Sequence, residues 1–339
     1  MERKRLLLLH VGGTIGMRRG ENGYIPEHGF LQSELDQMPE LLDPQLPEYR
    51  LLEFSPLLDS SNMTPADWLK IADLINLHYQ DFDGFVILHG TDTMAYTASA
   101  LPFMLQGLRK PVILTGSQIP LCQIRNDARE NLVTAMLIAA TYDVPEVCVY
   151  FSGKLIRGCR CTKVSAHDFD AFASPNYPLL GVAGTSIEIN RNALRDPPES
   201  DVRFKVQSLS PPRVGTLRLF PGITVDVVEH FLDQPLQGLV LEAYGSGNGP
   251  ASDRKLMQLI DNATQRGVIV VAVTQCGHGR VGLQSYATGH ALADAGVVSG
   301  HDMTVEAALT KLFYLHSISL DAEQIRQQME VSLVGELTR

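Results

Sequence analysis

Short apolar runs alternate along this chain with longer segments in which apolar residues recur at helical spacing. The runs that predict strands are 6–11, 84–88, 111–115, 146–151, 214–219, 238–242, 268–273 and 296–299. The segments that predict helices are 64–78, 94–107, 126–141, 224–233, 251–266, 304–316 and 321–330. Short apolar strands that alternate with helices are typical of parallel sheets covered on both faces. The pattern therefore predicts an α/β fold with largely parallel sheets.

A stretch rich in proline and charged residues divides the chain unequally. It includes Arg-Asp-Pro-Pro-Glu-Ser-Asp at 195–201 and Ser-Pro-Pro at 210–212. Such a composition suits an exposed connection, and 339 residues exceed the common size of one domain. We predict a larger N-terminal parallel-sheet domain over 1–190, a linker over 191–212 and a smaller C-terminal α/β domain over 213–339.

The overall charge narrows the class of partner. The formal net charge is −10 and the pI is about 5.5. A chain with this balance has no broad positive field, so we expect neither nucleic acid nor an anionic membrane as a partner. The apolar run Leu6–Leu9 ends at His10, short of the roughly 7 residues of a signal-peptide core, and no run reaches the roughly 18 of a membrane span. We expect a small-molecule substrate instead.

The five cysteines, at 122, 148, 159, 161 and 276, are odd in number and scattered. This pattern fits reduced thiols in the cytoplasm better than a disulfide framework. Cys159 and Cys161 are separated by a single residue, which is not the spacing of a zinc site. We therefore expect no metal site.

A glycine-rich turn, Gly12-Gly13-Thr14-Ile15-Gly16, follows the first predicted strand. Its glycines would let the backbone turn sharply and would display Thr14 at the strand end. A simple tight turn explains the same residues, and so does a phosphate-binding turn, although the full G-x-G-x-x-G pattern is absent. The polar stretch 17–27 that follows, with glycine and proline around Tyr24, predicts a mobile loop that acts as a lid.

A second polar turn, His89-Gly-Thr-Asp-Thr93, lies between the predicted strand 84–88 and a predicted helix. Helix capping accounts for one or two of these side chains. A hydroxyl beside a carboxylate suits nucleophilic or general-base chemistry when a lysine orients the carboxylate and balances its charge. Lys163 is a candidate because it follows the predicted strand 146–151. A solvated basic loop is the alternative for its segment.

Two kinds of turn remain as candidate binding elements. Leu58-Asp-Ser-Ser-Asn62 precedes a predicted helix, so its hydroxyls and backbone N–H groups are suited to hold a carboxylate; an ordinary solvated turn explains it equally well. The glycine-rich loops 245–249 and 277–280 follow predicted C-terminal strands, and either ligand binding or packing explains them.

Taken together, these stretches resemble the bacterial-type L-asparaginases, of the cytosolic type I group. The first family signature is matched by Gly-Gly-Thr-Ile at 12–15, after Val11 in place of the usual threonine. The second is matched in full by residues 84–94. The lysine loop of the family is matched within 157–163, and its C-terminal glycine-rich loop at 245–248. The resemblance covers essentially the whole chain.

The resemblance implies hydrolysis of L-asparagine to L-aspartate and ammonia through a threonine nucleophile and an acyl-enzyme intermediate, with no cofactor. By motif position, Thr14 is the nucleophile and Tyr24 activates it. The implied catalytic residues are Thr14, Tyr24, Thr91, Asp92 and Lys163. The implied substrate-binding residues are Ser60, Ser61, Thr91, Asp92 and Asn248. The resemblance also implies a homodimer or homotetramer with shared active sites, in which Asn248 serves a neighbouring chain.

Two other functions fit the same residues. One is an amidotransferase subunit that frees ammonia for a tRNA-linked reaction, and binding of a partner subunit and tRNA would favour it. The other is a catalytically silent asparagine sensor, which would bind asparagine without releasing ammonia.

Overall fold

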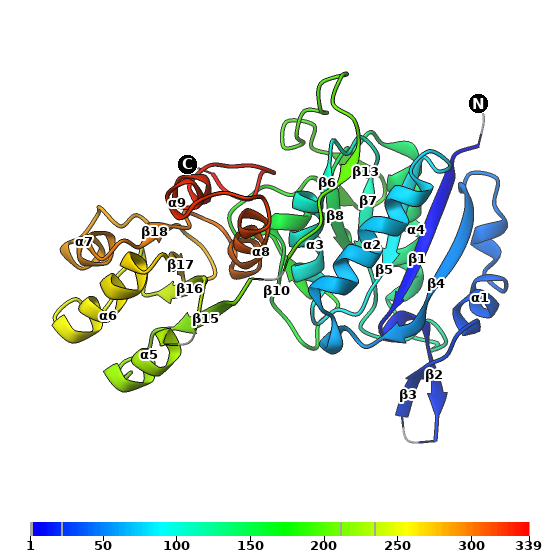
Figure 1. Ribbon diagram of the computed structural model, residues 1–339. Helices are drawn as coiled ribbons and strands as arrows, with labels where there is room; N and C mark the ends of the chain where they lie inside the picture. The colour runs from blue at the N-terminus through cyan, green and yellow to red at the C-terminus, as the bar shows by residue number, and fades with distance from the viewer. Residues whose placement is uncertain (1–2, 22, 211, 234, 339) are drawn as a thin grey trace. The chain divides into compact units, whose positions relative to one another are not determined.

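The computed structural model describes residues 3–21, 23–210, 212–233 and 235–338, and the chain divides into two compact units after Gln207 (Figure 1). Part of the stretch for which we predicted a linker packs on the first unit. There the Ala193 carbonyl accepts from Arg157 at 2.8 Å, and β14 (Lys205–Val206) pairs with β6 (Leu105–Gln106). Pro211, within the same stretch, lies outside the described residues. The boundaries at 190 and 213 stay predictions.

The first unit is built on an eight-stranded sheet in the order β13-β12-β9-β8-β7-β5-β1-β4. The strands are β1 (Arg5–Gly12), β4 (Glu48–Leu58), β5 (Gly84–Leu88), β7 (Val112–Thr115), β8 (Val147–Phe151), β9 (Lys154–Arg157), β12 (Gly181–Ala183) and β13 (Ile187–Ile189). Neighbouring strands run parallel from β4 to β8 and antiparallel from β8 to β13. The carboxyl ends of β4, β1, β5 and β7 therefore meet at one edge of the sheet.

Helices cover this sheet, as its apolar strands require. Leu6, Leu8 and Leu88 belong to one apolar cluster with α1 (Phe30–Leu35) and α4 (Ala128–Thr141). The residues that alternate with them in β1 and β5 point to the other face and are equally buried. Two further helices, α2 (Pro65–His78) and α3 (Met94–Met104), pack on each other in front of the sheet (Figure 1). Burial on both faces explains why β5 is apolar throughout and why β1 is apolar from Leu6 to Leu9.

The remaining elements of the first unit are short. They are the strands β2 (Met17–Gly20), β3 (Gly23–Pro26), β10 (Thr162–Lys163) and β11 (Phe172–Ala173), and the 3-10 turns η1 (Thr14–Gly16), η2 (Pro39–Leu42), η3 (Ser60–Asn62) and η4 (Gly158–Arg160).

The segment 17–27, for which we predicted a loop, instead contains an antiparallel hairpin of β2 and β3. Arg19 pairs with Tyr24 and Met17 with Pro26, and the hairpin projects from the unit in Figure 1. The two strands are short and exposed, and glycine and proline interrupt the alternation that predicts strands. The pattern therefore had no strand signal here. Asn22 lies outside the described residues.

The second unit contains a four-stranded parallel sheet in the order β15-β16-β17-β18. Its strands are β15 (Val214–Arg218), β16 (Gly238–Ala243), β17 (Ile269–Thr274) and β18 (Val298–Ser299). Its helices are α5 (Val225–Leu232), α6 (Arg254–Gln265), α7 (Ala287–Asp294), α8 (Val305–His316) and α9 (Ala322–Met329). Two apolar clusters, one with α5, α6 and α7 and one with α8 and α9, include alternate residues of β16 and β17.

A buried ion pair holds the C-terminal segment on this unit. Lys311 in α8 lies 2.6 Å from Glu336, and neither side chain is exposed. Lys311 also donates to the Met329 and Val331 carbonyls at 3.0 and 2.6 Å. Among the described residues, no helix has the length and apolar composition needed to cross a bilayer.

Candidate active site

Three turns at the carboxyl edge of the large sheet touch through their glycine backbones. They follow the neighbouring strands β4, β1 and β5. A Cβ atom on Gly13 would lie 2.3 Å from the Gly90 nitrogen, and one on Gly90 would lie 2.5 Å from Ser60 Oγ. Gly13 also has a φ of 86°, which disfavours any other residue, and its N–H donates to the Leu58 carbonyl at 3.2 Å. The glycines therefore bring the turns that carry Thr14, Ser60 and Thr91 into contact.

Behind these turns, a chain of hydrogen bonds fixes the backbone at Gly90. The Gly90 carbonyl can only accept, so His89 Nδ1 carries the ring proton and donates to it at 2.7 Å. His89 Nε2 therefore accepts from the Thr97 hydroxyl at 2.9 Å, and Thr97 Oγ1 accepts from Trp68 Nε1 at 3.0 Å. Complete burial lowers the pKa of His89 to about 4, so the ring is uncharged at neutral pH. His89 thus supports the turn and does not reach its polar surface.

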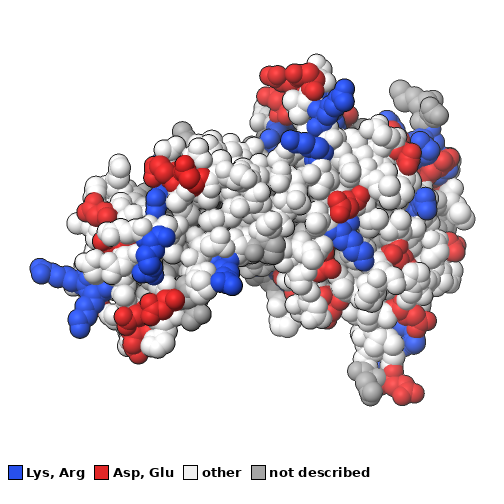
Figure 2. Space-filling view, viewed as in Figure 1, with Lys and Arg blue, Asp and Glu red and all other residues white. Residues whose placement is uncertain are grey.

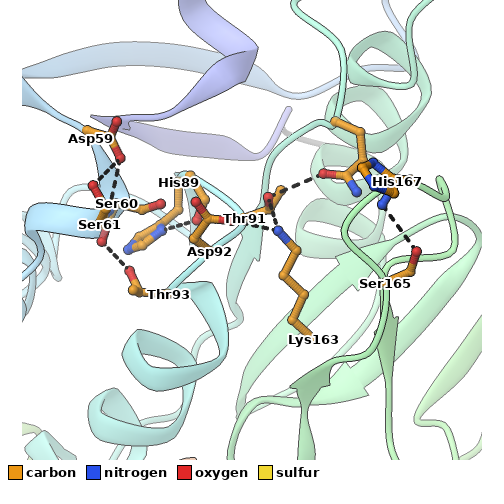
Figure 3. Close-up of polar contacts among 12 residues, drawn as sticks. Asp59, Ser60, Ser61, His89, Thr91, Asp92, Thr93, Lys163, Ser165 and His167 are labelled. Carbon is orange, nitrogen blue, oxygen red and sulfur yellow. Dashed lines mark hydrogen bonds and ion pairs between the residues drawn. The ribbon is translucent and has the colours of Figure 1, made fainter.

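The Thr91 hydroxyl lies between side chains from two other strand ends (Figure 3). Lys163 Nζ donates to Thr91 Oγ1 at 2.8 Å and to Asp92 Oδ1 at 2.7 Å. Thr91 Oγ1 donates in turn to Gln118 Oε1 at 3.3 Å. Thr91 is 8% exposed, whereas the Asp92 side chain is 68% exposed. The lysine charge is therefore directed at a nearly buried hydroxyl, while the carboxylate beside it stays hydrated.

Gln118 is a member of this cluster that the sequence reasoning missed. It follows β7, and its backbone N–H donates at 2.9 Å to Asp127, at the start of α4. Its Nε2 donates to the Asp168 carbonyl at 3.1 Å, which leaves Oε1 to accept from Thr91. Its position after the predicted strand 111–115 could have indicated it, because Thr91 was found by its position after the predicted strand 84–88.

Thr14 begins η1, directly after β1, and is half-buried. Its hydroxyl makes no hydrogen bond with any residue in the part of the chain that the structure describes. β3, which carries Tyr24, lies beside this turn. The Tyr24 side chain is exposed, and its hydroxyl accepts from Gln123 Nε2, not from Thr14. The structure brings the two elements side by side without a direct contact between the two hydroxyls.

The two serines of η3 lie differently. Ser60 is buried against Gly90, and its carbonyl accepts from Thr93 Oγ1 at 2.7 Å. Ser61 is exposed, and its backbone N–H and hydroxyl both donate to Asp59 Oδ1 at 2.9 Å (Figure 3). Ser60 is thus placed with the Thr91 turn, whereas Ser61 serves the cap of its own turn.

Asn248 belongs to the second unit, at the carboxyl end of β16. Its Oδ1 accepts from Thr288 Oγ1 at 2.6 Å, and its backbone closes a turn on Tyr244. Gly245 and Gly247 in this turn have φ values of 48° and 105°. Asn248 is therefore held in a defined turn of the second unit.

On the face drawn in Figure 2, lysine and arginine are interspersed with aspartate and glutamate, without a continuous basic area. Among the residues that the structure describes, no three His, Cys, Asp or Glu side chains gather to hold a metal ion. All five cysteines are free thiols.

The two units define a two-part α/β protein with hydroxyl, carboxylate and ammonium groups at one edge of its larger sheet. Each unit also matches a family model: residues 5–195 match "Asparaginase, N-terminal" and residues 213–329 match "Glutaminase/Asparaginase C-terminal domain". The chain belongs to the asparaginase family.

Known proteins resemble the chain over its whole length. L-asparaginase 1 of Escherichia coli (strain K12) is 52% identical over 338 residues, which cover 100% of this chain and 99% of that protein. The 60 kDa lysophospholipase of Mus musculus is 44% identical over 99% of this chain and 63% of its own length. The crystal structure of L-asparaginase I from Vibrio cholerae is 46% identical and superposes with a TM-score of 0.92, covering 99% of this chain and 100% of that one.

Proposed function

We propose that this protein is an L-asparaginase that hydrolyses L-asparagine to L-aspartate and ammonia through an acyl-enzyme intermediate on Thr14. The observation that carries the proposal is the contact of Lys163 with both Thr91 and Asp92, at 2.8 and 2.7 Å, beside the turn that bears Thr14. The full-length identity of 52% to L-asparaginase 1 supports the choice of substrate.

In the first step, Thr14 Oγ attacks the side-chain carboxamide carbon of asparagine and ammonia leaves. A threonine hydroxyl is a weak nucleophile, so a neighbouring group must accept its proton and pass a proton to the leaving amide nitrogen. Tyr24 is one candidate, and the Thr91–Asp92–Lys163 cluster acting through a water molecule is the other. Backbone N–H groups of the glycine turns are suited to stabilise the oxyanion. In the second step, water hydrolyses the β-aspartyl ester on Thr14 and releases aspartate.

We assign the substrate's α-carboxylate to the Ser60–Ser61 turn. Ser60 lies against Gly90, the residue before Thr91. The Ser60–Ser61 turn is followed closely by α2. Backbone N–H groups before a helix favour an anion, so a carboxylate held there would place the side-chain amide toward Thr14 and Thr91. Ser60→Ala should raise KM more than it lowers kcat, because the serine binds the substrate without entering the chemistry.

The nucleophile assignment is tested by ammonia release from asparagine with Thr14→Ala and Thr14→Ser. We expect Thr14→Ala to lower kcat by on the order of 10³-fold or more, because no hydroxyl remains to form the ester. Thr14→Ser keeps a hydroxyl at the same position and should retain much of the activity. Near-native ammonia release by Thr14→Ala would show that another residue is the nucleophile.

The same assay separates the alternatives. A protein that binds asparagine but releases no ammonia would be the silent sensor. Binding of tRNA and a partner subunit would identify the amidotransferase subunit.

We further propose a cytoplasmic homodimer or homotetramer in which Asn248 contributes to the active site of a neighbouring chain. Free thiols fit a reducing compartment, and the Asn248 turn lies at the strand ends where α/β sheets bind ligands. Co-expression of Thr14→Ala and Asn248→Ala chains tests the shared site. Mixed oligomers should recover activity that neither variant has alone, and no recovery would contradict sharing.

A further inference from the structure

Glu53 connects both ends of the segment that carries Tyr24. It lies in β4 opposite His10 of β1, and its side chain is 6% exposed. Its Oε1 accepts from His10 Nδ1 at 3.0 Å. Its Oε2 lies 2.7 Å from the Gly29 backbone N–H and 3.2 Å from His28 Nδ1. One carboxylate therefore meets groups from before and after the hairpin.

The contact at the first end reaches the catalytic turn through His10. The His10 ring is completely buried, and a Cβ atom on Gly16 would lie 2.5 Å from its Nε2 and Cε1. Gly16 is the last residue of η1 and directly precedes β2. Glu53 thus orients the ring that packs against Gly16, where the Thr14 turn ends and the hairpin begins.

The contact at the second end fixes the point where the chain leaves the hairpin. Gly29 has a φ of 80° and stands just before α1, and the exposed His28 precedes it. Between the two ends, the hairpin is held together by β2–β3 pairing and by the ion pair of Arg18 with Glu27. A segment with internal bonds and two fixed ends moves as a unit about those ends.

Two further polar contacts restrain the part of the hairpin that the structure describes. The Cys122 thiol donates to the Met17 carbonyl at 3.4 Å, and Gln123 donates to the Tyr24 hydroxyl. A thiol is a weak donor, and the Gln123 contact is exposed. The charge-assisted bonds to the buried Glu53 are the stronger restraints.

We propose that Glu53 is a positioning residue that clamps both ends of the β2–β3 hairpin and thereby sets where Tyr24 stands relative to Thr14. The inference rests on the proposed function only in giving Tyr24 a part in catalysis. A carboxylate suits this task because both of its oxygens accept hydrogen bonds. An amide has one accepting oxygen, so its NH₂ group would face either His10 Nδ1 or the Gly29 N–H.

The test compares Glu53→Gln with the wild-type protein by native-state hydrogen exchange and by steady-state ammonia release. We expect amide exchange at 17–21 and 23–29 to rise at least about tenfold, with β5 and β7 unchanged. We expect kcat to fall on the order of tenfold, with a smaller change in KM, because the displaced tyrosine acts in the chemical step. Glu40→Gln is the matched control: it removes an exposed glutamate that pairs with Arg129, and should change neither the hairpin exchange nor kcat.

Exchange in Glu53→Gln that is unchanged at the hairpin, or raised equally in β5 and β7, would overturn the clamp. If this variant does not fold, His28→Ala replaces it, because His28 is exposed and still contacts Glu53. A smaller rise in exchange at 17–21 and 23–29, with β5 and β7 unchanged, is then expected, and its absence would overturn the proposal. Exchange is measured without substrate, so it decides the clamp even if the wild-type protein releases no ammonia, a result that would instead overturn the proposed function.

Discussion

Replacing Lys163 with methionine should nearly abolish catalysis while leaving the fold intact. Methionine keeps the length of the apolar stem but removes the ammonium that contacts Thr91 and Asp92. Asp92 is mostly exposed, so water solvates its carboxylate when the ammonium is removed. The loss of such an exposed ion pair costs no more than about 1 kcal/mol of folding stability. Thr91 is nearly buried and loses a charged donor aimed at its oxygen.

The catalytic loss is expected to be much larger than the stability loss. Removal of one preorganised donor costs about 10²- to 10³-fold in kcat, and the shared role of Thr91, Asp92 and Lys163 places the effect at the upper end, about 4 kcal/mol of transition-state stabilisation. Ammonia release measures kcat, and urea unfolding measures stability.

A matched control isolates the effect of position. Lys154 pairs with Asp170 at 2.6 Å in the same unit, and Lys154→Met removes an equivalent ammonium away from Thr91. It should leave kcat unchanged. A Lys163→Met variant with kcat within tenfold of wild type, or one whose lost activity follows lost stability, would refute the reasoning.

Three further predictions concern the framework of the two units. Gly13→Ala places a methyl group 2.3 Å from the Gly90 nitrogen and should lower kcat at least about tenfold in ammonia release, because the two turns must separate. Lys311→Met leaves Glu336 buried without its charge partner and should lower the free energy of unfolding by about 3–5 kcal/mol in urea. Burial lowers the pKa of His89 from 6.5 to about 4, so the folded state excludes a proton that the unfolded state binds. Stability should therefore fall by up to about 3 kcal/mol as the pH drops from 6.5 to 4, and His89→Gln should flatten this part of the profile.

The sequence predicted strands from apolar runs and helices from the helical spacing of apolar residues. Each predicted strand and helix is present, and β5 has the predicted bounds, 84–88. β4 was missed because an edge strand mixes polar and apolar residues, and Pro56 within it is tolerated only where no neighbour needs the N–H. Of the helices, α1 and α7 were missed: α1 has only 6 residues, and α7 contains Gly289, which weakens a helical pattern.

The candidate site was predictable as a set of turns but not as a set of contacts. Parallel strands place their carboxyl ends together, which is why Thr14, Thr91 and Lys163 were expected at one edge. Which side chains touch depends on strand order and register, which periodicity does not encode. Gln118 and Glu53 were missed for this reason: each reaches its partner across the sheet, from another strand or the turn after it, and neither lies in a glycine-rich turn.

The contacts at this edge also separate two kinds of polar group. His89 and Glu53 are buried, and each forms a hydrogen bond with a backbone group of a turn. His89 is neutral, whereas the hydrogen bond from His10 lowers the pKa of Glu53. Asp92 and Tyr24 are exposed and contribute little to stability. A buried polar group is costly unless its bonds are complete, so the first pair fixes the backbone with little freedom. The exposed pair keeps the freedom to contact a substrate.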